Sequence, residues 1–448
     1  MDVATGHRWR TWAGTARCSP AHLVRPVHES EISDAIRTAA ERGLTVRAAG
    51  TGHSFNALGC TDGVLVDLSG FTGVVNLDAD AATIEVKAGT TLRDVNAALA
   101  KAGLALANVG TLADQTVAGA ISTGNHGSGI RHRPFSSQVV RLRLAGADGE
   151  VRACDAESDP DLMRCARTAL GALGVITTVT LRCVPRFNIR VVHGSEPLDG
   201  FLERIAEWAY DGDHVAFNWL PWTAQVATRT MRMTTDAPSR ALARRRYART
   251  LDEVRCGSVG LLARLNPAAV PGLTGRFQRT RPTADYVDAS HEVFCFRQPV
   301  RFLALEHALP LERLAPAVRA VRQTLRRCGQ YSPYSVLGRV GAADDSPLSL
   351  SYGRRTGYLN LTVPRSAGYV EILRACEHVL REFDARPHWG KAHTATADIL
   401  EPRYPQWALF QRMRAKLDPD GVFTNDFLHR VIGPVGDREA VPAARSWE

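Results

Sequence analysis

Lysine is scarce in this chain of 448 residues. Only four of its 55 basic residues are lysines: Lys87, Lys101, Lys391 and Lys416. The formal net charge of +9 therefore rests on arginine, a bias more typical of genome composition than of phosphate recognition. The densest basic run, Arg240 to Arg249, is expected to be a solvated helix or loop, with a partner-binding or nucleic-acid-binding patch as the alternative. We predict no nucleic-acid partner.

Long apolar runs are also missing from the chain. No stretch approaches the roughly 18 apolar residues that a membrane span requires, so we predict no membrane span. The first ten residues are polar and lack the apolar core of a signal peptide, which favours a cytoplasmic location. The composition, 45% hydrophobic and 23% charged, is that of an ordinary globular protein, long enough for two domains or one elaborate domain.

Paired cysteine motifs are absent as well. The nine cysteines include no C-x-x-C pair and show no regular spacing. An odd, irregular set argues against a disulfide framework and against a zinc site. We therefore predict free thiols in a reducing compartment, no metal site and no catalytic cysteine.

Helix and strand patterns alternate through the first 185 residues, which predicts an α+β fold. Helices are expected at 31–42, capped by Ser30, and at 92–102 and 162–173. Strands are expected at 44–48, 63–68, 83–86 and 175–184, and a hairpin at 139–144 and 150–153. From about Asn188 aromatic residues become more frequent and glycine-rich loops stop, which indicates a second domain.

The first glycine-rich loop carries the strongest chemical signal. The segment Arg47-Ala48-Ala49-Gly50-Thr51-Gly52-His53-Ser54 follows a short apolar strand. Its small residues let the backbone fold tightly around an anion, and a histidine then emerges from the loop. This combination suggests a flavin whose diphosphate lies on the loop and whose ring is reached, covalently, by His53.

A second loop of similar kind follows about 70 residues later, over residues 117–129, and also carries a histidine, His126. Its small residues allow close approach to a flat ligand, and its hydroxyl and N–H groups can bind phosphate or ring heteroatoms. Neither loop matches G-x-G-x-x-G or a Walker A pattern, which argues against a Rossmann or P-loop nucleotide site.

Several long motifs make this chain similar to one family. They include Trp9-x-x-Trp12-x-Gly14, the two loops at 50–70 and 118–129, and the segments GALGVIT, RPHWGKAH, RYPQW and LDPDGVFTNDF, which begin at residues 171, 386, 403 and 417. The chain resembles the aldonolactone oxidase and alditol oxidase branch of the vanillyl-alcohol oxidase and p-cresol methylhydroxylase (PCMH) superfamily.

The resemblance implies an α+β fold of two parts. A PCMH-type FAD-binding domain with two subdomains is expected over residues 1–187, with residues 400–448 packing back on it. A substrate, or cap, domain with a central antiparallel sheet is expected over residues 188–399. FAD is the implied cofactor, linked covalently to His53. Only a single link is expected, because the second loop lacks the cysteine of bicovalent relatives.

The resemblance also assigns residues to the cofactor. In the first loop these are Ala49, Gly50, Thr51, Gly52, His53 and Ser54. In the second loop they are Val117, Gly119, Ala120, Ser122, Thr123, Asn125, His126 and Gly127. Ile176 and Asn425 complete the set. Gly124 and Asn125 lie in the loop where residue size distinguishes oxidases from dehydrogenases. The sequence does not decide between these two activities.

Lys391 and Arg339 match the catalytic lysine and arginine of the family. An ammonium at position 391 can stabilise an alkoxide or a reduced, anionic flavin. A structural role is expected for His388 and His393. The chain departs from the family at Leu337, where relatives carry a glutamate, and near Thr362, where they often carry a histidine. These departures favour a less hydroxylated or anionic substrate beside Arg339.

The resemblance implies an FAD-dependent oxidoreductase that oxidises a CH–OH group of a sugar-derived lactone or polyol, with O2 as acceptor and H2O2 as product. The main alternative is an enzyme of specialised metabolism on the same scaffold, acting on a modified sugar, nucleoside or other small alcohol. Two further readings are a flavin-binding protein without turnover and an NAD(P)H-dependent reductase. Bleaching of the flavin by an alcohol would indicate an oxidising enzyme, and bleaching by NADPH would indicate a reductase. No bleaching would indicate a flavin-binding protein without turnover.

Overall fold

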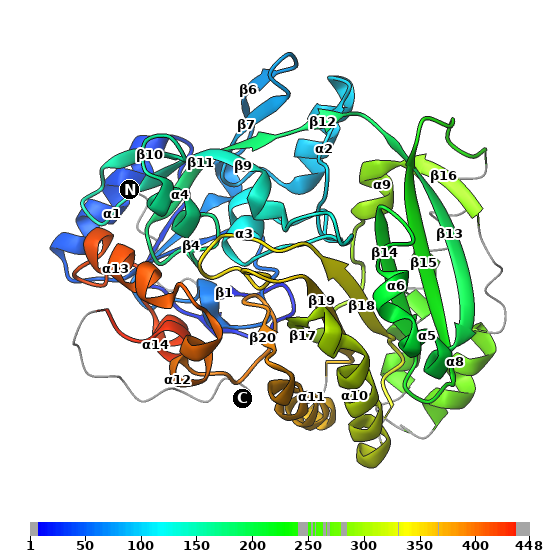
Figure 1. The fold of residues 1–448 in the computed structure, drawn as a ribbon. Coiled ribbons are helices and arrows are strands. Elements are labelled where there is room, and N and C mark those ends of the chain that lie inside the picture. The colour runs from blue at the N-terminus through cyan, green and yellow to red at the C-terminus, as the bar shows by residue number, and fades with distance from the viewer. Residues whose placement is uncertain are drawn as a thin grey trace.

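The computed structural model describes residues 8–435 except 241–249, 252–253, 256, 263–265, 267–268, 279–284, 330 and 366. Most of the basic segment Arg240 to Arg249 therefore lies outside the described residues. The described chain forms an α+β fold, as predicted, built on two small sheets at the N-terminal side and one large antiparallel sheet (Figure 1). No helix among the described residues is long and apolar enough to cross a membrane.

The N-terminal part contains two subdomains. In the first, a parallel sheet has the order β3 (His22–Val24), β5 (Val64–Asp67), β4 (Val46–Ala49), and α1 (Glu29–Glu41) connects β3 to β4. The apolar face of α1, with Ile32 and Ile36 fully buried, packs into the same core as these strands.

The second subdomain is an antiparallel sheet. Its strand order is β10 (Val151–Asp155), β9 (Val139–Ala145), β11 (Val175–Arg182), β7 (Thr83–Lys87), β6 (Val74–Asp78). Strands β9 and β10 form the predicted hairpin. Two short sheets pair β1 (Trp9–Arg10) with β2 (Arg17–Cys18), and β8 (Leu104–Ala105) with β12 (Val184–Pro185). The helices of this part are α2 (Leu92–Lys101), α3 (Val117–Ser122) and α4 (Pro160–Ala166).

Two helix predictions need correction. The helix expected over 162–173 is α4, which starts at Pro160 behind the N-cap Asp159 and ends at Ala166. The helix could not extend to residue 173 as expected, because Leu170 and Gly171 adopt left-handed backbone angles, with φ of 57° and 66°. The N-cap of α1 is His28 rather than Ser30, because Glu31 accepts hydrogen bonds from the backbone N–H groups of Val27 and His28.

The cap domain is built on an eight-stranded antiparallel sheet. Its order is β16 (Asp285–Ala289), β13 (Asn188–Pro197), β15 (Gln225–Thr234), β14 (His214–Trp219), β18 (Val336–Gly341), β19 (Thr356–Val363), β17 (Leu303–Pro310), β20 (Arg386–Pro387). This confirms the predicted central antiparallel sheet. The boundaries 1–187 and 188–399 stay predictions, although β13 begins at Asn188.

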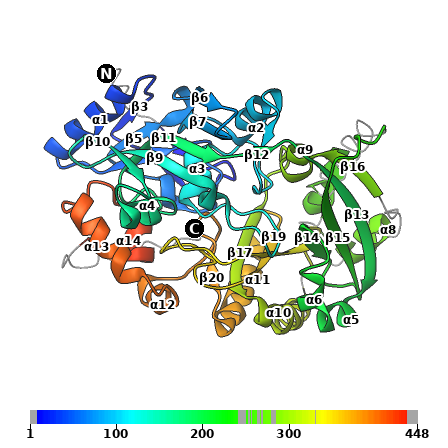
Figure 2. The same cartoon turned by 45° about the horizontal axis from the view of Figure 1, so that its top comes forward.

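Most of the cap-domain helices described in the structure cover one face of this large sheet, whereas α9 (Ser290–Phe294) packs on the opposite face. The helices of the cap domain include α5 (Leu198–Glu203), α6 (Ile205–Trp208), α8 (Val270–Gln278), α9, α10 (Leu314–Cys328) and α11 (Ala367–Leu380). Apolar residues of α5, α6, α10 and α11 form one core with alternate residues of the central strands, including Phe217, Trp219 and Leu359. Figure 2 shows α10 and α11 on the side of the sheet away from α3. The other face therefore looks toward the N-terminal part.

The C-terminal segment returns to the N-terminal part. Its helices are α12 (Ala397–Leu400), α13 (Trp407–Leu417) and α14 (Asp426–Ile432), and their apolar residues belong to the N-terminal core. The N–H of Val46 in β4 donates to the carbonyl of Val422 over 2.7 Å. The two glycine-rich loops are thus supported from both ends of the chain.

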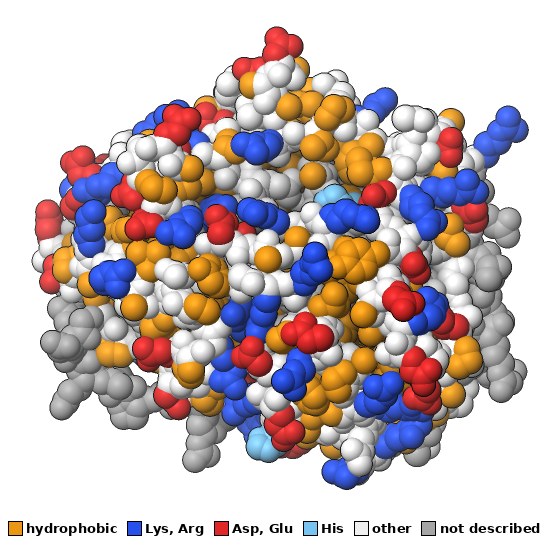
Figure 3. Space-filling model, in the orientation of Figure 1, with side chains coloured by type: hydrophobic (Ala, Val, Ile, Leu, Met, Phe, Trp, Pro, Cys, Tyr) orange, Lys and Arg blue, Asp and Glu red, His pale blue; other side chains and the backbone are white. Residues whose placement is uncertain are grey.

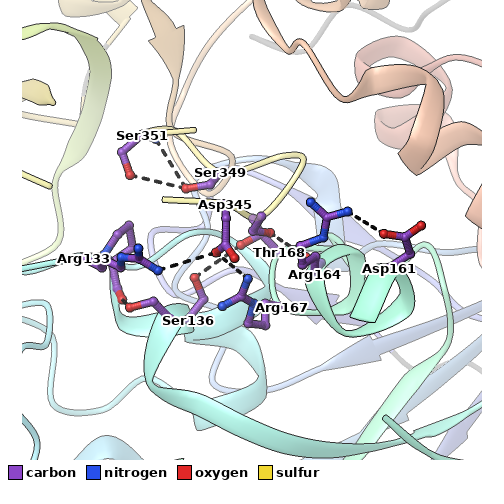
Figure 4. Close-up of polar contacts among 12 residues, drawn as sticks. Arg133, Ser136, Asp161, Arg164, Arg167, Thr168, Asp345, Ser349 and Ser351 are labelled. Atoms are coloured by element: carbon purple, nitrogen blue, oxygen red, sulfur yellow. Dashed lines mark hydrogen bonds and ion pairs between the residues drawn. The ribbon is translucent and has the colours of Figure 1, made fainter. Parts of the chain in front are cut away.

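A group of polar contacts joins the cap domain to the N-terminal part (Figure 4). Asp345, in the loop after β18, accepts from Arg167 over 2.6 Å and lies 4.0 Å from Arg133. The hydroxyl of Ser346 donates to the carbonyl of Arg164 over 2.8 Å. Basic and acidic side chains elsewhere are interspersed over the face of the molecule seen in Figure 3.

Candidate functional site

The first glycine-rich loop begins at the end of β4, where a buried arginine fixes it. Arg47 donates to the carbonyls of Leu58, Leu170, Gly171 and Phe423, at 2.6–3.0 Å. Burial, followed by the nearby charge of Arg414, lowers the pKa of Arg47 to about 10, so the guanidinium stays charged at neutral pH. This one side chain holds together three segments that surround the loop.

The two glycine-rich loops touch each other at Gly50. A Cβ at this position would lie 2.2 Å from Oγ1 of Thr116, the N-cap of α3. At Gly52 the backbone has φ of +69°, and its carbonyl accepts from the N–H of Trp12 over 2.7 Å. Glycine is therefore required at position 50 by close approach and favoured at position 52 by backbone conformation.

A cleft lies between these loops. Ten of the predicted cofactor residues line it: Ala49, Gly50, Thr51, Gly52, His53, Ser54, Gly119, Ser122, Thr123 and Ile176. Gly174, predicted with Ile176 to contact the adenine half of the cofactor, also lines the cleft. The prediction did not include other lining residues, among them Leu58, Gln115, Thr116 and Leu170. Most of these residues flank the predicted segments in the sequence. Their position next to a motif is the signal that could have identified them.

His53 lies at the cleft with an unsatisfied ring nitrogen. Its Nδ1 is buried and has no hydrogen-bond partner in the described structure. Burial, followed by the charge of Lys391, lowers the pKa of His53 to about 4, so the ring is neutral at pH 7. Trp12 packs against it at 5.2 Å between ring centroids. A neutral imidazole with a free lone pair, beside a cleft lined by glycines, fits a histidine that binds a flavin.

The remaining predicted cofactor residues do not line the cleft. Val117 and Ala120 are fully buried in the core. The amide of Asn125 bonds to Gly110 N–H and Gln115. Asn425 caps α14 and donates to the carbonyls of 57, 58 and 60. Gly127 packs against Asn108, which leaves no room for a Cβ. Contact of these residues with the cofactor stays a prediction.

The predicted catalytic lysine lies directly beside the first loop. Asn56 donates its amide to the carbonyls of Trp389 and Lys391 at 2.7 and 2.9 Å, and Phe55 N–H donates to Gly390 over 2.7 Å. The Lys391 side chain is 16% exposed, and its Nζ lies 5.0 Å from the centre of the Phe55 ring. These contacts hold His53 and Lys391 in one site.

Glu306 of β17 is a site residue that the sequence did not indicate. Its Oε2 lies 3.8 Å from Nζ of Lys391, and its Oε1 lies 2.7 Å from Nε2 of His126. Burial by itself would raise the pKa of Glu306, but the charge and hydrogen bond of His126 and the charge of Lys391 lower it overall. His126, predicted as a cofactor residue, thus joins the second loop to the cap sheet.

Arg339 lies on the same face of the cap sheet. It pairs with Tyr358 of β19, whose ring stacks on His126 with centroids 3.6 Å apart. Paired residues of adjacent antiparallel strands share a face, so Arg339, Tyr358 and His126 meet on one side. Burial lowers the pKa of Arg339, and Glu306 opposes that shift.

Leu337, one of the two departures from the family, lies in the neighbouring row of this face. Asn218, Leu337, Asn360 and Glu306 are consecutive partners across β14, β18, β19 and β17. Asn360 donates to Thr362 over 3.0 Å, while its own Oδ1 is buried and has no hydrogen-bond partner among the described residues. Leu337 is therefore an apolar residue in an otherwise polar row.

His388 and His393 differ in their contacts. His388 accepts from Gly390 N–H at Nδ1, and burial lowers its pKa to about 3. His126, Glu306 and His388 bring three potential metal ligands within 4.8 Å of one another. The ammonium of Lys391, 3.8 Å from Glu306, opposes a further cation there. His393 is buried and packs edge-on against Phe427.

Comparison with known proteins identifies the family. A family model described as D-arabinono-1,4-lactone oxidase matches residues 179–431, and one described as an FAD binding domain matches residues 20–155. The chain is 36% identical to L-gulono-1,4-lactone dehydrogenase of Mycobacterium tuberculosis over 95% of this chain and 99% of that protein. It is 31% identical to mouse L-gulonolactone oxidase, over 95% and 98%.

Two further similarities agree with this assignment. Alditol oxidase of a Streptomyces species is 31% identical over 94% of this chain and 98% of that protein. The crystal structure of cholesterol oxidase from Brevibacterium sterolicum superposes with a TM-score of 0.80 over 97% of this chain and 98% of that one, at 16% identity, which shows a shared fold. Together with the cleft and its histidine, these findings show that the chain belongs to the D-arabinono-1,4-lactone oxidase family of FAD-dependent oxidoreductases.

Proposed function

We propose that this protein oxidises a secondary or primary alcohol carbon of a sugar-derived lactone or polyol, beside the buried cluster of Lys391, Arg339 and Glu306. When bound, FAD accepts the hydride that leaves the substrate carbon. The observation that carries the proposal is the position of Lys391. It is tied through Asn56 to the loop that presents His53, so the cationic group and the cofactor histidine share one site.

The chain's own residues would handle charge and position. Loss of the hydroxyl proton to water, together with the loss of hydride that bound FAD would accept, would place negative charge on the substrate oxygen. The ammonium of Lys391 and the guanidinium of Arg339 would stabilise that oxygen. Both lie in a partly buried site, where such interactions are stronger than in water.

We also propose that His53 bonds covalently to FAD. The free lone pair of its neutral ring and its place beside the cleft support this assignment. The residues of the two loops that line the cleft would hold the diphosphate and the flavin ring. An attached imidazole withdraws electrons from the flavin, which favours hydride uptake.

The electron acceptor is a separate proposal. We favour O2 with release of H2O2, as the name of the mouse relative indicates for that protein, whereas the mycobacterial relative is named a dehydrogenase. Leu337 and Thr362, which replace polar residues of the family, support the alternative substrates, a modified sugar, a nucleoside or another small alcohol. The comparisons do not favour this alternative over a lactone or polyol.

An anaerobic bleaching screen tests the proposal. The purified holoenzyme is mixed with lactones, alditols, sugars and nucleosides, and the flavin absorbance is followed before and after admission of air. Bleaching by a lactone or polyol supports the main proposal, and return of colour with peroxide release supports O2 as acceptor. Bleaching only by a nucleoside or simple alcohol would replace the substrate assignment, and bleaching only by NADPH would contradict the proposed reaction.

A further inference from the structure

Glu306 is placed between two groups that carry or can carry a proton. One carboxylate oxygen contacts His126 and the other faces Lys391, and the side chain is 10% exposed. The three side chains come from distant parts of the chain: the loop after α3, strand β17 and the turn after β20. A single carboxylate is thus shared by two potential cations.

Hydrogen-bond geometry fixes the proton count around His126. Its Nδ1 lies 3.1 Å from the carbonyl of Gly127, which can only accept, so Nδ1 carries a proton. Its Nε2 lies 2.7 Å from Oε1 of Glu306, so one proton lies between these two atoms. The pair is either an imidazolium with a carboxylate or a neutral imidazole with a carboxylic acid.

The surroundings of Glu306 favour the charged form. Lys391 faces its second oxygen, Arg339 lies on the same sheet face, and the pKa of Glu306 is lowered overall despite its burial. The ring of Tyr358, stacked on His126 at 3.6 Å, offers a π face to an imidazolium. A carboxylate at position 306 then leaves both protons of the His126 ring in place.

Lys391 depends on the same carboxylate. Burial lowers the pKa of its ammonium, and the charge of Arg339 lowers it further, while Glu306 acts in the opposite direction. Two neutral rings also lie near it, those of Phe55 and His53. Among the residues described, Glu306 is the one acidic group that acts on Lys391, so removal of its charge would leave the burial of the ammonium without that offset.

We propose that Glu306 is a positioning residue that holds Lys391 as an ammonium and His126 as an imidazolium, so that a fixed cationic cluster faces the substrate. The catalytic role of Glu306 rests on the proposed function, whereas its effect on the protonation of Lys391 and His126 does not. Lys391 in this view stabilises the substrate oxygen and does not remove its proton.

The scarcity of lysine makes a direct test possible. Competitive acetylation of the holoenzyme with acetic anhydride, at a series of pH values, measures the fraction of neutral amine at each lysine by mass spectrometry. Lys87, Lys101 and Lys416 serve as internal references. In Glu306→Gln, we expect Lys391 to lose its proton at least one pH unit below the wild-type value, with the three reference lysines unchanged.

Two other variants keep the test decisive if Glu306→Gln does not fold. Glu306→Asp retains the charge and should leave the titration of Lys391 closer to wild type. His126→Gln removes the competing cation and should shift the titration of Lys391 upward. Glu85→Gln is the matched control, since Glu85 contacts Thr178 in the sheet of the N-terminal part and should have no effect.

The activity profile gives the second readout. The alkaline limb of kcat/KM against pH should move to lower pH in Glu306→Gln by the same amount as the titration of Lys391. Unchanged titration of Lys391 in Glu306→Gln, or an equal shift in Glu85→Gln, would overturn the inference. A shifted titration in an enzyme that oxidises no alcohol would instead uphold this inference and contradict the proposed function.

Discussion

At the scale of single residues, the site depends on charges and lone pairs that burial has adjusted. His53 is neutral because burial and a nearby ammonium both disfavour its protonated form. Lys391 and Arg339 are partly buried cations that share Glu306 as their acidic neighbour. The roles of these residues in cofactor and substrate chemistry follow from this arrangement.

Replacement of His53 by alanine should abolish any covalent flavin link. After acid precipitation of the variant, we expect the flavin in the supernatant rather than in the pellet, because the only proposed attachment atom is gone. The exposed His28, replaced by alanine in the same way, is the control. Flavin that stays with the precipitated His53→Ala protein would refute attachment at this residue.

Replacement of Lys391 by methionine should lower kcat/KM by about 10²–10³, the usual loss when one charged or hydrogen-bonding partner of a developing oxyanion is removed. The exposed Lys416, changed to methionine, should leave the rate unchanged. Steady-state kinetics with the substrate found in the bleaching screen measure the effect. A loss of less than threefold would remove Lys391 from the proposed chemistry.

At the scale of elements, two loops and a strand face create the site. The loop after β4 and the N-terminal end of α3 approach so closely that Gly50 and Thr116 are in contact. The cap sheet turns its polar face toward these loops because α10 and α11 cover the other face. The cleft therefore needs both loops at their present separation.

Gly50→Ala should reduce FAD occupancy strongly, because the added methyl group would lie 2.2 Å from Oγ1 of Thr116 and push the loops apart. The ratio of flavin to protein absorbance in the purified variant measures the effect. A second change, Thr116→Ala, should restore part of the occupancy by removing the clashing atoms. Gly200→Ala, where no atom lies within 4 Å of the added carbon, is the control. Full occupancy in Gly50→Ala would contradict the role given to this contact.

At the scale of the whole molecule, polar contacts between the cap domain and the N-terminal part keep the sheet face opposite the loops. Asp345 and Arg167 form the shortest of these side-chain contacts in Figure 4, at 2.6 Å. Burial would raise the pKa of Asp345, but the charge of Arg167 and its hydrogen bond outweigh this and lower it overall. The folded state therefore favours the carboxylate.

Asp345→Asn should lower the free energy of unfolding by about 0.5–1 kcal/mol near pH 7, a modest value because the Asp345 side chain is 48% exposed. A group with a lowered pKa stabilises the fold above its unfolded value, here 3.8, and this gain is lost as pH falls through the folded value. Denaturant unfolding at pH 7 and at a series of pH values below 3.8 should show a difference between variant and wild type that shrinks as pH falls and disappears once pH is below the folded pKa. An equal difference at all of these pH values would exclude an electrostatic origin.

The sequence by itself determined the family, the cofactor and the main elements. Its two glycine-rich loops are local features. Small residues beside a histidine allow the same tight backbone and the same exposed ring whatever the rest of the fold. Helices α1 and α2 and the hairpin of β9 and β10 also follow from local periodicity. Helix α4 is shorter than expected, and no sequence pattern predicted the left-handed backbone conformation of Leu170.

Only the tertiary structure decided the composition of the catalytic cluster. Glu306 stands in an apolar strand, and its meeting with His126, 180 residues earlier, depends on strand register and on packing of the cap against the loops. Arg47 likewise reaches the carbonyl of Phe423, 376 residues away. One sequence specifies such contacts only through the whole fold, because the register between distant strands is set by the complete sheet and its core.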